Sequence, residues 1–102
     1  MMYLSCFDAK AEVSAKDINK EREKWVEEGR DKQLLEKCRS VKRYEVIGKS
    51  PLQIVFIIDT DDPTALNILA RHFGKKWNCV TYPVIERDIR AALQADTTIV
   101  AG

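Results

Sequence analysis

The longest apolar run in the chain, Leu52–Ile58, predicts a central β-strand, because only Gln53 interrupts it. A strand is hydrophobic at nearly every position when both of its faces are covered. Shorter segments that are apolar, β-branched or alternating predict three more strands, at residues 2–7, 41–47 and 77–85. Pro83 interrupts the last of these, which is typical of an edge strand or a bulge, because proline donates no hydrogen bond to a neighbouring strand.

Helical spacing begins after the first predicted strand. Ser14, with Asp17 three residues later, has the spacing of an N-terminal capping box. Trp25 and Gly29 lie on the apolar face that follows, but helical periodicity does not carry that face on to the leucines beyond it. We therefore expect the helix to break near Gly29 and a second helical piece to run from about residue 31 to residue 39.

The segment after the central strand predicts another helix. Asp62 is a favourable N-cap, and Pro63 suits the first helical position, where no backbone N–H is needed. Gly74 predicts the C-terminal end of this helix. The apolar stripe between these ends consists of Leu66, Leu69, Ala70 and Phe73.

The predicted order is strand, helix, strand, strand, helix, strand, which defines an α+β fold. Two split β-α-β units of this kind form a ferredoxin-like β-α-β-β-α-β domain with an antiparallel four-stranded sheet and its helices on one face. We expect a single domain over residues 1–95, since 102 residues are too few for two domains. A short C-terminal helix is expected over residues 86–94, and residues 96–102 are expected to form a tail or an extra strand.

The predicted central strand has large apolar side chains on both of its faces. Ile54, Phe56 and Ile58 point one way, and Val55 and Ile57 point the other. Helices on one side of the sheet leave the other side bare, and a large bare apolar patch is a liability for a monomer. The pattern therefore predicts a homodimer, or a multiple of it, in which a second copy packs sheet to sheet.

Charge and cysteine content limit the kinds of ligand and partner that the sequence predicts. The formal net charge of +1 lacks the basic excess of nucleic-acid-binding proteins, so no nucleic-acid role is predicted. Three cysteines without a CxxC spacing and a single histidine do not make a closed zinc site, and we expect neither a metal nor a cofactor. No apolar run reaches the roughly 20 residues of a membrane helix. With an odd cysteine count and no signal peptide, the protein is expected to be cytoplasmic.

His72, the only histidine, is the candidate catalytic residue, because its imidazole is the only side chain here whose ordinary pKa is near neutrality. It would act as a general acid or base at the mouth of a cavity. Alternatively, it lies in the last turn before Gly74 and interacts with the C-terminal end of its helix.

Four more polar residues are candidate ligand-binding residues. Arg43 and Glu45 are two positions apart in a predicted strand and share one face, where the planar arginine fork would orient a carboxylate or carbonyl group. Alternatively, they form an exposed pair. Ser5 and Tyr82, on the first and last strands, would supply hydroxyl groups to the same cavity, although Tyr82 also fits a core position.

The remaining conspicuous residues are assigned structural roles. Cys6 and Cys79 have no evident cationic neighbour and are expected to be buried structural thiols. The acidic cluster Asp59–Asp62 lacks the spacing of an EF-hand loop, and helix capping explains it. The residues that we assign to the core rather than to a ligand site are Ile18, Trp25, Leu66, Leu69 and Phe73.

Over roughly residues 2–88 the chain resembles the dimeric α/β-barrel superfamily, and within it the DUF3303 and muconolactone-isomerase-like branches. The segments that carry the resemblance are MYLSCF, WVEEG, VIGKSPLQIVFIIDTDDPTAL and WNCVTYPVIE. The resemblance implies the fold, the homodimer, and a cavity between sheet and helices that holds a small organic molecule. The Trp- and Arg-rich segment before the second strand of the isomerases reads CRSVKRY here, so no catalytic residue carries over.

Two functions remain open at this point. The first is a homodimeric small-molecule-binding protein or cofactor-independent enzyme, isomerase- or monooxygenase-like, that uses the cavity. The second is a non-catalytic assembly or regulatory module on the same dimer, with the charged first helix as its docking surface. The interleaved acids and bases of that helix equally fit a solvated face.

Overall fold

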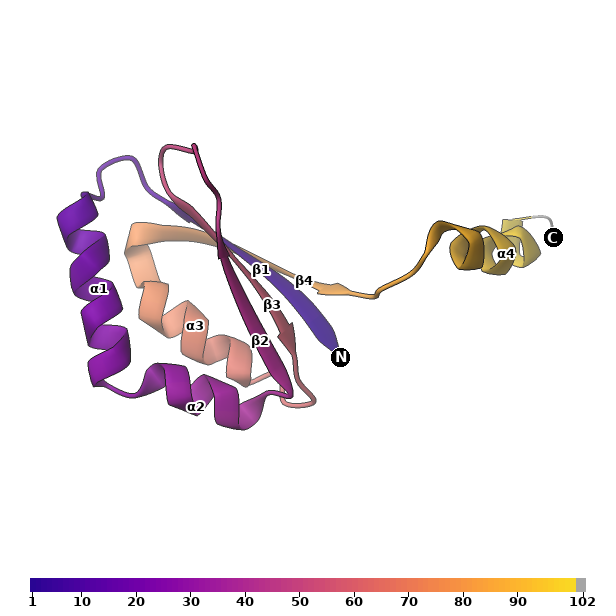
Figure 1. The fold of residues 1–102 in the computed structure, drawn as a ribbon, viewed down its shortest axis with the longest axis horizontal. Coiled ribbons are helices and arrows are strands. Elements are labelled where there is room, and N and C mark those ends of the chain that lie inside the picture. Colours follow the sequence, from indigo (N-terminus) through magenta and orange to yellow (C-terminus); the bar gives the residue numbers. More distant parts are fainter. Residues whose placement is uncertain (101–102) are drawn as a thin grey trace.

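The computed structural model describes residues 1–100, which form four β-strands and four α-helices (Figure 1). In chain order these are β1 (Met2–Ala9), α1 (Ala15–Glu27), α2 (Arg30–Lys37), β2 (Ser40–Glu45), β3 (Gln53–Asp59), α3 (Ala65–Phe73), β4 (Trp77–Val84) and α4 (Ile89–Val100). A single 3-10 turn, Gly74–Lys76, joins α3 to β4.

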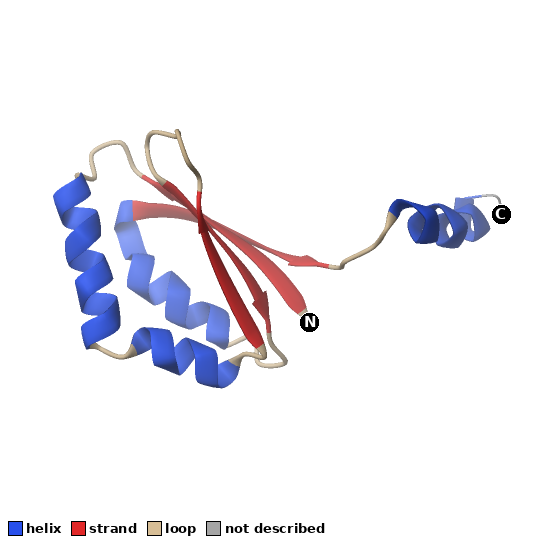
Figure 2. Cartoon of the chain, in the orientation of Figure 1, coloured by secondary structure: helices blue, strands red, loops and turns tan. Residues whose placement is uncertain are grey.

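The four strands form one antiparallel sheet in the order β2-β3-β1-β4. Helices α1, α2 and α3 lie on one side of it (Figure 2). The two inner strands are β3 and β1, and β4 lies at an edge, as Pro83 indicates. The predicted ferredoxin-like α+β fold is therefore confirmed, with its first helix divided into two.

The division of the first helix falls at Gly29, where the sequence predicts it. The Ser14 side chain accepts a hydrogen bond of 3.2 Å from the backbone N–H of Asp17, which caps the start of α1. Gly29 has a φ of 67°, a left-handed conformation that glycine adopts at little cost. The chain turns there, and α2 buries Leu34 against the core.

Helix α3 begins later than the sequence predicts. Asp62 accepts a hydrogen bond of 3.0 Å from the backbone N–H of Thr64, so it caps a turn that precedes the helix rather than a helix starting at Pro63. Ala70 is exposed, so its assignment to the apolar stripe is wrong: it follows the buried Leu69 directly and is rotated about 100° from it around the helix. The buried residues of α3 are Ala65, Leu69 and Phe73. Gly74 ends the helix as predicted.

The hydrophobic core lies between the sheet and helices α1 to α3. The ring of Phe7 in β1 stacks on Phe73 of α3, with centroids 4.0 Å apart, and meets Phe56 of β3 edge-on at 5.8 Å. Ile54 and Ile58 fill the same layer and are almost completely buried. Each fully buried side chain of this kind contributes roughly 1.5–3 kcal/mol to folding. These contacts fix α3 over the two central strands.

The opposite side of the sheet, which we call the open face, has no cover from the described part of the chain (Figure 2). The strand register places on its middle Leu4, Cys6, Val55, Ile57, Val80 and Tyr82, with Lys42 and Tyr44 of β2 beside them and Asp8, Gln53 and Asn78 at one end. Val80 and Tyr82 are 46% and 53% exposed. The middle of the open face is therefore an apolar surface in contact with solvent.

Helix α4 differs from the expected C-terminus. It begins at Ile89 and continues through residues predicted to be a tail, so the expected domain boundary after residue 95 falls inside it. Residues 101–102 lie outside the described part. The helix stands on an arm beyond β4, away from the sheet (Figure 1), and exposes Ile89 and Leu93. Among the described residues, no helix combines the length and hydrophobicity that crossing a bilayer requires.

Candidate functional site

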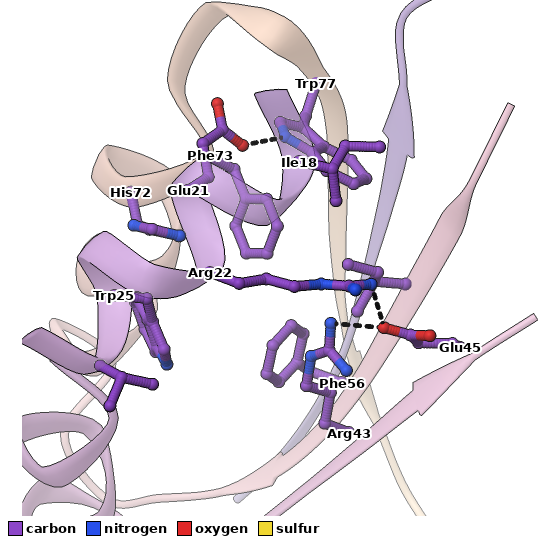
Figure 3. A pocket seen from close by; sticks show the side chains of 12 residues that line it. Ile18, Glu21, Arg22, Trp25, Arg43, Glu45, Phe56, His72, Phe73 and Trp77 are labelled. Atoms are coloured by element: carbon purple, nitrogen blue, oxygen red, sulfur yellow. Dashed lines mark hydrogen bonds and ion pairs between the residues drawn. The ribbon is translucent and has the colours of Figure 1, made fainter. Parts of the chain in front are cut away.

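A cavity of about 330 Å³ lies between the sheet and the helices α1 and α3 (Figure 3). Much of its wall is apolar or aromatic, formed by residues that include Ile18, Trp25, Phe56, Phe73 and Trp77. The sequence assigns Ile18, Trp25 and Phe73 to the core, and the structure shows that they also line this cavity. Its size and wall suit a small organic molecule.

Arg43 and Glu45 lie at one end of the cavity, on the helix-facing side of β2. Their i,i+2 spacing puts them on one face of the strand, as predicted, and Arg43 Nη2 donates to Glu45 Oε1 at 2.9 Å. Both side chains are 39% exposed, so they also form the exposed pair that was the alternative. Arg22 reaches across from α1 and bonds to the same carboxylate oxygen (Figure 3). The ion pair thus joins α1 to the sheet beside the cavity.

His72 lies on the cavity wall and also in the last turn of α3, so the structure places it where both alternatives require. Its ring packs against Trp25, with centroids 4.5 Å apart. Burial lowers the pKa of His72, the nearby carboxylates of Glu21 and Glu28 act in the opposite direction, and Arg30 adds to the lowering. The imidazole is therefore neutral at pH 7 and able to accept a proton.

Glu21 and Trp77 close another part of the cavity wall. The indole Nε1–H of Trp77 donates a hydrogen bond of 2.9 Å to Glu21 Oε2, and Lys76 Nζ lies 3.8 Å from Glu21 Oε1. Sequence reasoning missed Glu21, Trp77 and Arg22 as lining residues. For Arg22 a signal existed, because it follows Ile18 by four residues on the helix and shares its face.

The structure separates Ser5 from Tyr82. Ser5 faces the helices, is fully buried and shares a hydrogen bond of 2.9 Å with Thr81, but it is not among the residues that line the cavity. Tyr82 pairs with Leu4 and therefore points to the open face. The two hydroxyl groups consequently do not meet in one cavity.

The three cysteines are free thiols with different surroundings. Cys79 is exposed, which corrects its assignment as a buried thiol, because α1 to α3 do not cover this part of the edge strand β4. Cys6 is half-buried on the open face. Burial raises the pKa of the Cys38 thiol, so it is a weak nucleophile.

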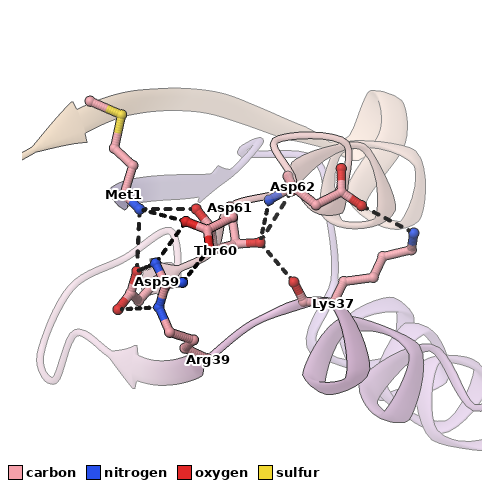
Figure 4. Close-up of polar contacts among 7 residues, drawn as sticks. All are labelled: Met1, Lys37, Arg39, Asp59, Thr60, Asp61 and Asp62. Atoms are coloured by element: carbon pink, nitrogen blue, oxygen red, sulfur yellow. Dashed lines mark hydrogen bonds and ion pairs between the residues drawn. The ribbon is translucent and has the colours of Figure 1, made fainter.

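The acidic cluster Asp59–Asp62 has more than a capping role (Figure 4). Arg39 bonds to both Asp59 and Asp61, which lowers the pKa of each carboxyl. The buried Thr60 hydroxyl donates to the backbone carbonyl of Lys37 at 2.7 Å. The cluster therefore ties the end of α2 to the β3–α3 loop, and capping explains only Asp62.

No protein-family model and no curated protein matches the chain. Solved structures do resemble it. A dimeric ferredoxin-like protein from an uncultured marine organism is 13% identical, with a TM-score of 0.52 over 84% of this chain and 96% of that one. An antibiotic biosynthesis monooxygenase is 18% identical, with a TM-score of 0.49 over 84% of this chain and 100% of that one.

A protein of Arabidopsis thaliana is 10% identical, with a TM-score of 0.46 over 87% of this chain and 100% of that one. The likeness to the marine protein agrees with the strand order and places the chain in the ferredoxin-like α+β fold. At this level of identity the likeness concerns the fold alone.

Proposed function

We propose that the protein binds a small, largely apolar organic molecule in the cavity between sheet and helices, as a homodimer and without a cofactor. The observation that carries this proposal is the composition of the cavity wall. Aromatic side chains form much of it, and a few polar groups gather at its edges: Arg22, Arg43, Glu45 and His72. An apolar pocket with a few placed polar groups is typical of small-molecule sites.

If the protein is an enzyme, His72 is its general base. The imidazole is half-buried, neutral at pH 7 and on the cavity wall, so it can remove a proton from a bound molecule. Proton removal of this kind serves isomerase- and monooxygenase-like reactions that use no cofactor. The resemblance to the DUF3303 and muconolactone-isomerase-like branches belongs to the same proposal.

The homodimer is supported by the open face. An apolar sheet surface of this kind marks an interaction site, and a second copy offers a surface of the same chemistry around a two-fold axis. The marine protein with the same fold is described as dimeric. Because the cavity lies on the opposite side of the sheet, each protomer would keep its own cavity accessible.

Tryptophan fluorescence tests the binding proposal directly. The chain has only two tryptophans, Trp25 and Trp77, and both line the cavity. Titration with a panel of lactones, quinones and aromatic acids should give a saturable change in emission and a higher melting temperature with at least one class. Trp25→Phe and Trp77→Phe variants then assign the signal, and native mass spectrometry shows a retained molecule as added mass on a dimer.

A bare monomer in native spectra, together with no saturable response across the panel, would contradict the proposal. A reproducible mass added to twice the 11.7 kDa chain mass would support both the dimer and the ligand.

A second candidate function, an assembly or regulatory module, is favoured by α4. This helix exposes Ile89 at 84% and Leu93 at 70%, on an arm that stands apart from the sheet. A helix of about 12 residues is marginally stable alone, so another protein surface would stabilise it. Purification from native lysate that recovers only this chain would contradict the candidate.

A further inference from the structure

The polar end of the cavity holds more positive than negative charge. Arg22 and Arg43 both bond to a single carboxylate oxygen, Oε1 of Glu45. Two guanidinium groups therefore face one carboxylate. Arginine is ionised at every physiological pH, so this end keeps a net charge of about +1.

Much of the hydrogen-bonding capacity of the two arginines is unused by the described residues. Besides the bonds to Glu45, Arg22 donates only to Asn19, at a long distance of 3.4 Å, and Arg43 has no other side-chain partner in the described chain. Each guanidinium carries five N–H donors in a planar fork that matches a carboxylate.

The other acidic group of the cavity wall does not offset this charge. Glu21 is already bonded to Trp77 and lies 3.8 Å from Lys76. It comes from the same helix as Arg22, but its carboxylate points away from the Arg22–Glu45 pair and toward Trp77 (Figure 3). The unbalanced positive charge is thus localised between Arg22 and Arg43.

We infer that the molecule bound in this cavity is a planar aromatic acid whose carboxylate lies between Arg22 and Arg43; the inference rests on the proposed function. The aromatic wall, including Trp25 and Phe56, packs on the ring of the ligand, and the arginine forks receive its acidic group. Glu45 holds the two forks in place and competes with the ligand for them.

A matched pair of probes tests the inference: 1-naphthoate and 1-naphthamide have nearly the same shape and differ in charge. Titration calorimetry near neutral pH and at low salt should show naphthoate binding about tenfold more tightly than naphthamide. Arg43→Gln and Arg22→Gln should each reduce this ratio toward one. Arg87→Gln is the matched control, because Arg87 also pairs with a carboxylate, that of Asp96 at 3.2 Å, but outside the cavity.

Glu45→Gln separates a binding role of the arginines from a merely structural one. Removing the competing carboxylate raises the net charge of the site, so the naphthoate-to-naphthamide ratio should increase severalfold. A decrease would overturn the inference, as would equal affinity of the two probes for the unaltered protein. Equal affinity would leave the proposed function standing, whereas binding of neither probe, together with a silent panel, would remove both.

Discussion

The two faces of the sheet are built from alternate residues of the same strands, yet they end in different environments. On the helix side, Phe7, Ile54, Phe56 and Ile58 are at most 4% exposed. On the open face, residues that differ from them by one position along the strand, such as Val55 and Ile57, are only partly covered. In β3, large apolar side chains point to both faces, and helices cover only one of them.

The difference in cover between the two faces shows how much of the hydrophobic stabilisation a single chain achieves by itself. Packing of α1 to α3 completes one apolar layer and leaves the cavity within it. The second apolar layer contributes fully only when something covers it, since the stabilisation is roughly proportional to the apolar area removed from water. The helix side therefore carries the stability of the protomer and its site, and the open face is available for assembly.

The largest effect is expected on the helix side, from Phe7→Ala. Phe7 is 1% exposed and stacks on Phe73, so its truncation leaves a cavity and should lower the free energy of unfolding by about 3–5 kcal/mol. Urea denaturation with a fluorescence readout measures the loss. Tyr82→Ala, an aromatic truncation on the open face, should cost much less at protein concentrations where the chain is monomeric. Equal costs for the two variants would remove the distinction between the faces.

An intermediate effect is expected from Ile57→Lys at the middle of the open face. Lys42 is already the cross-strand partner of Ile57 on this face, so a second lysine would place two like charges side by side in the proposed interface. We expect the dimer to weaken at least about a hundredfold. Sedimentation analysis over a range of concentrations measures the change, and Ile57→Val is the conservative control. The folded protomer should survive, because the substitution does not touch the helix-side core. An Ile57→Lys variant that remains dimeric would show that the interface lies elsewhere.

The fold was predictable because several local signals agreed. The hydrophobicity of β3 predicted a central strand. Gly29 and Gly74, which follow helical segments, predicted helix ends, and the spacing of Ser14 and Asp17 predicted a helix start. Helix α4 was predicted only in part, since a helix was expected over residues 86–94 and the structure has it at Ile89–Val100. Its ends were hard to place because no packing against the sheet limits the helix.

Site residues were predictable where the alternation of side chains along a strand determines which face they share. They were not predictable where strand register or the rotation of a helix determines which way a side chain points. Arg43 and Glu45 share a face by spacing alone, and the structure places both at the cavity. Tyr82 was assigned to that cavity although its position in β4 turns it to the open face, since a shift of one residue exchanges the faces. Arg22 was missed because it lies among many charged residues of α1, most of which face solvent.

The smallest effect is a change of stability with pH. It concerns the helix side of the sheet, where His72 lies. Burial lowers the pKa of His72 below its usual 6.5; Glu21 and Glu28 oppose this lowering, while Arg30 and Lys24 add to it. Near pH 6 the unfolded chain therefore binds this proton more readily than the folded protein, so the free energy of unfolding falls as the pH falls.

Melting temperatures measured between about pH 7.5 and about pH 5.5 should decrease more for the unaltered protein than for His72→Gln. Carboxylates whose pKa is lowered titrate below this window, so they do not obscure the comparison. If both proteins respond alike, the imidazole is solvated in the folded state, and its role as a half-buried base fails with it.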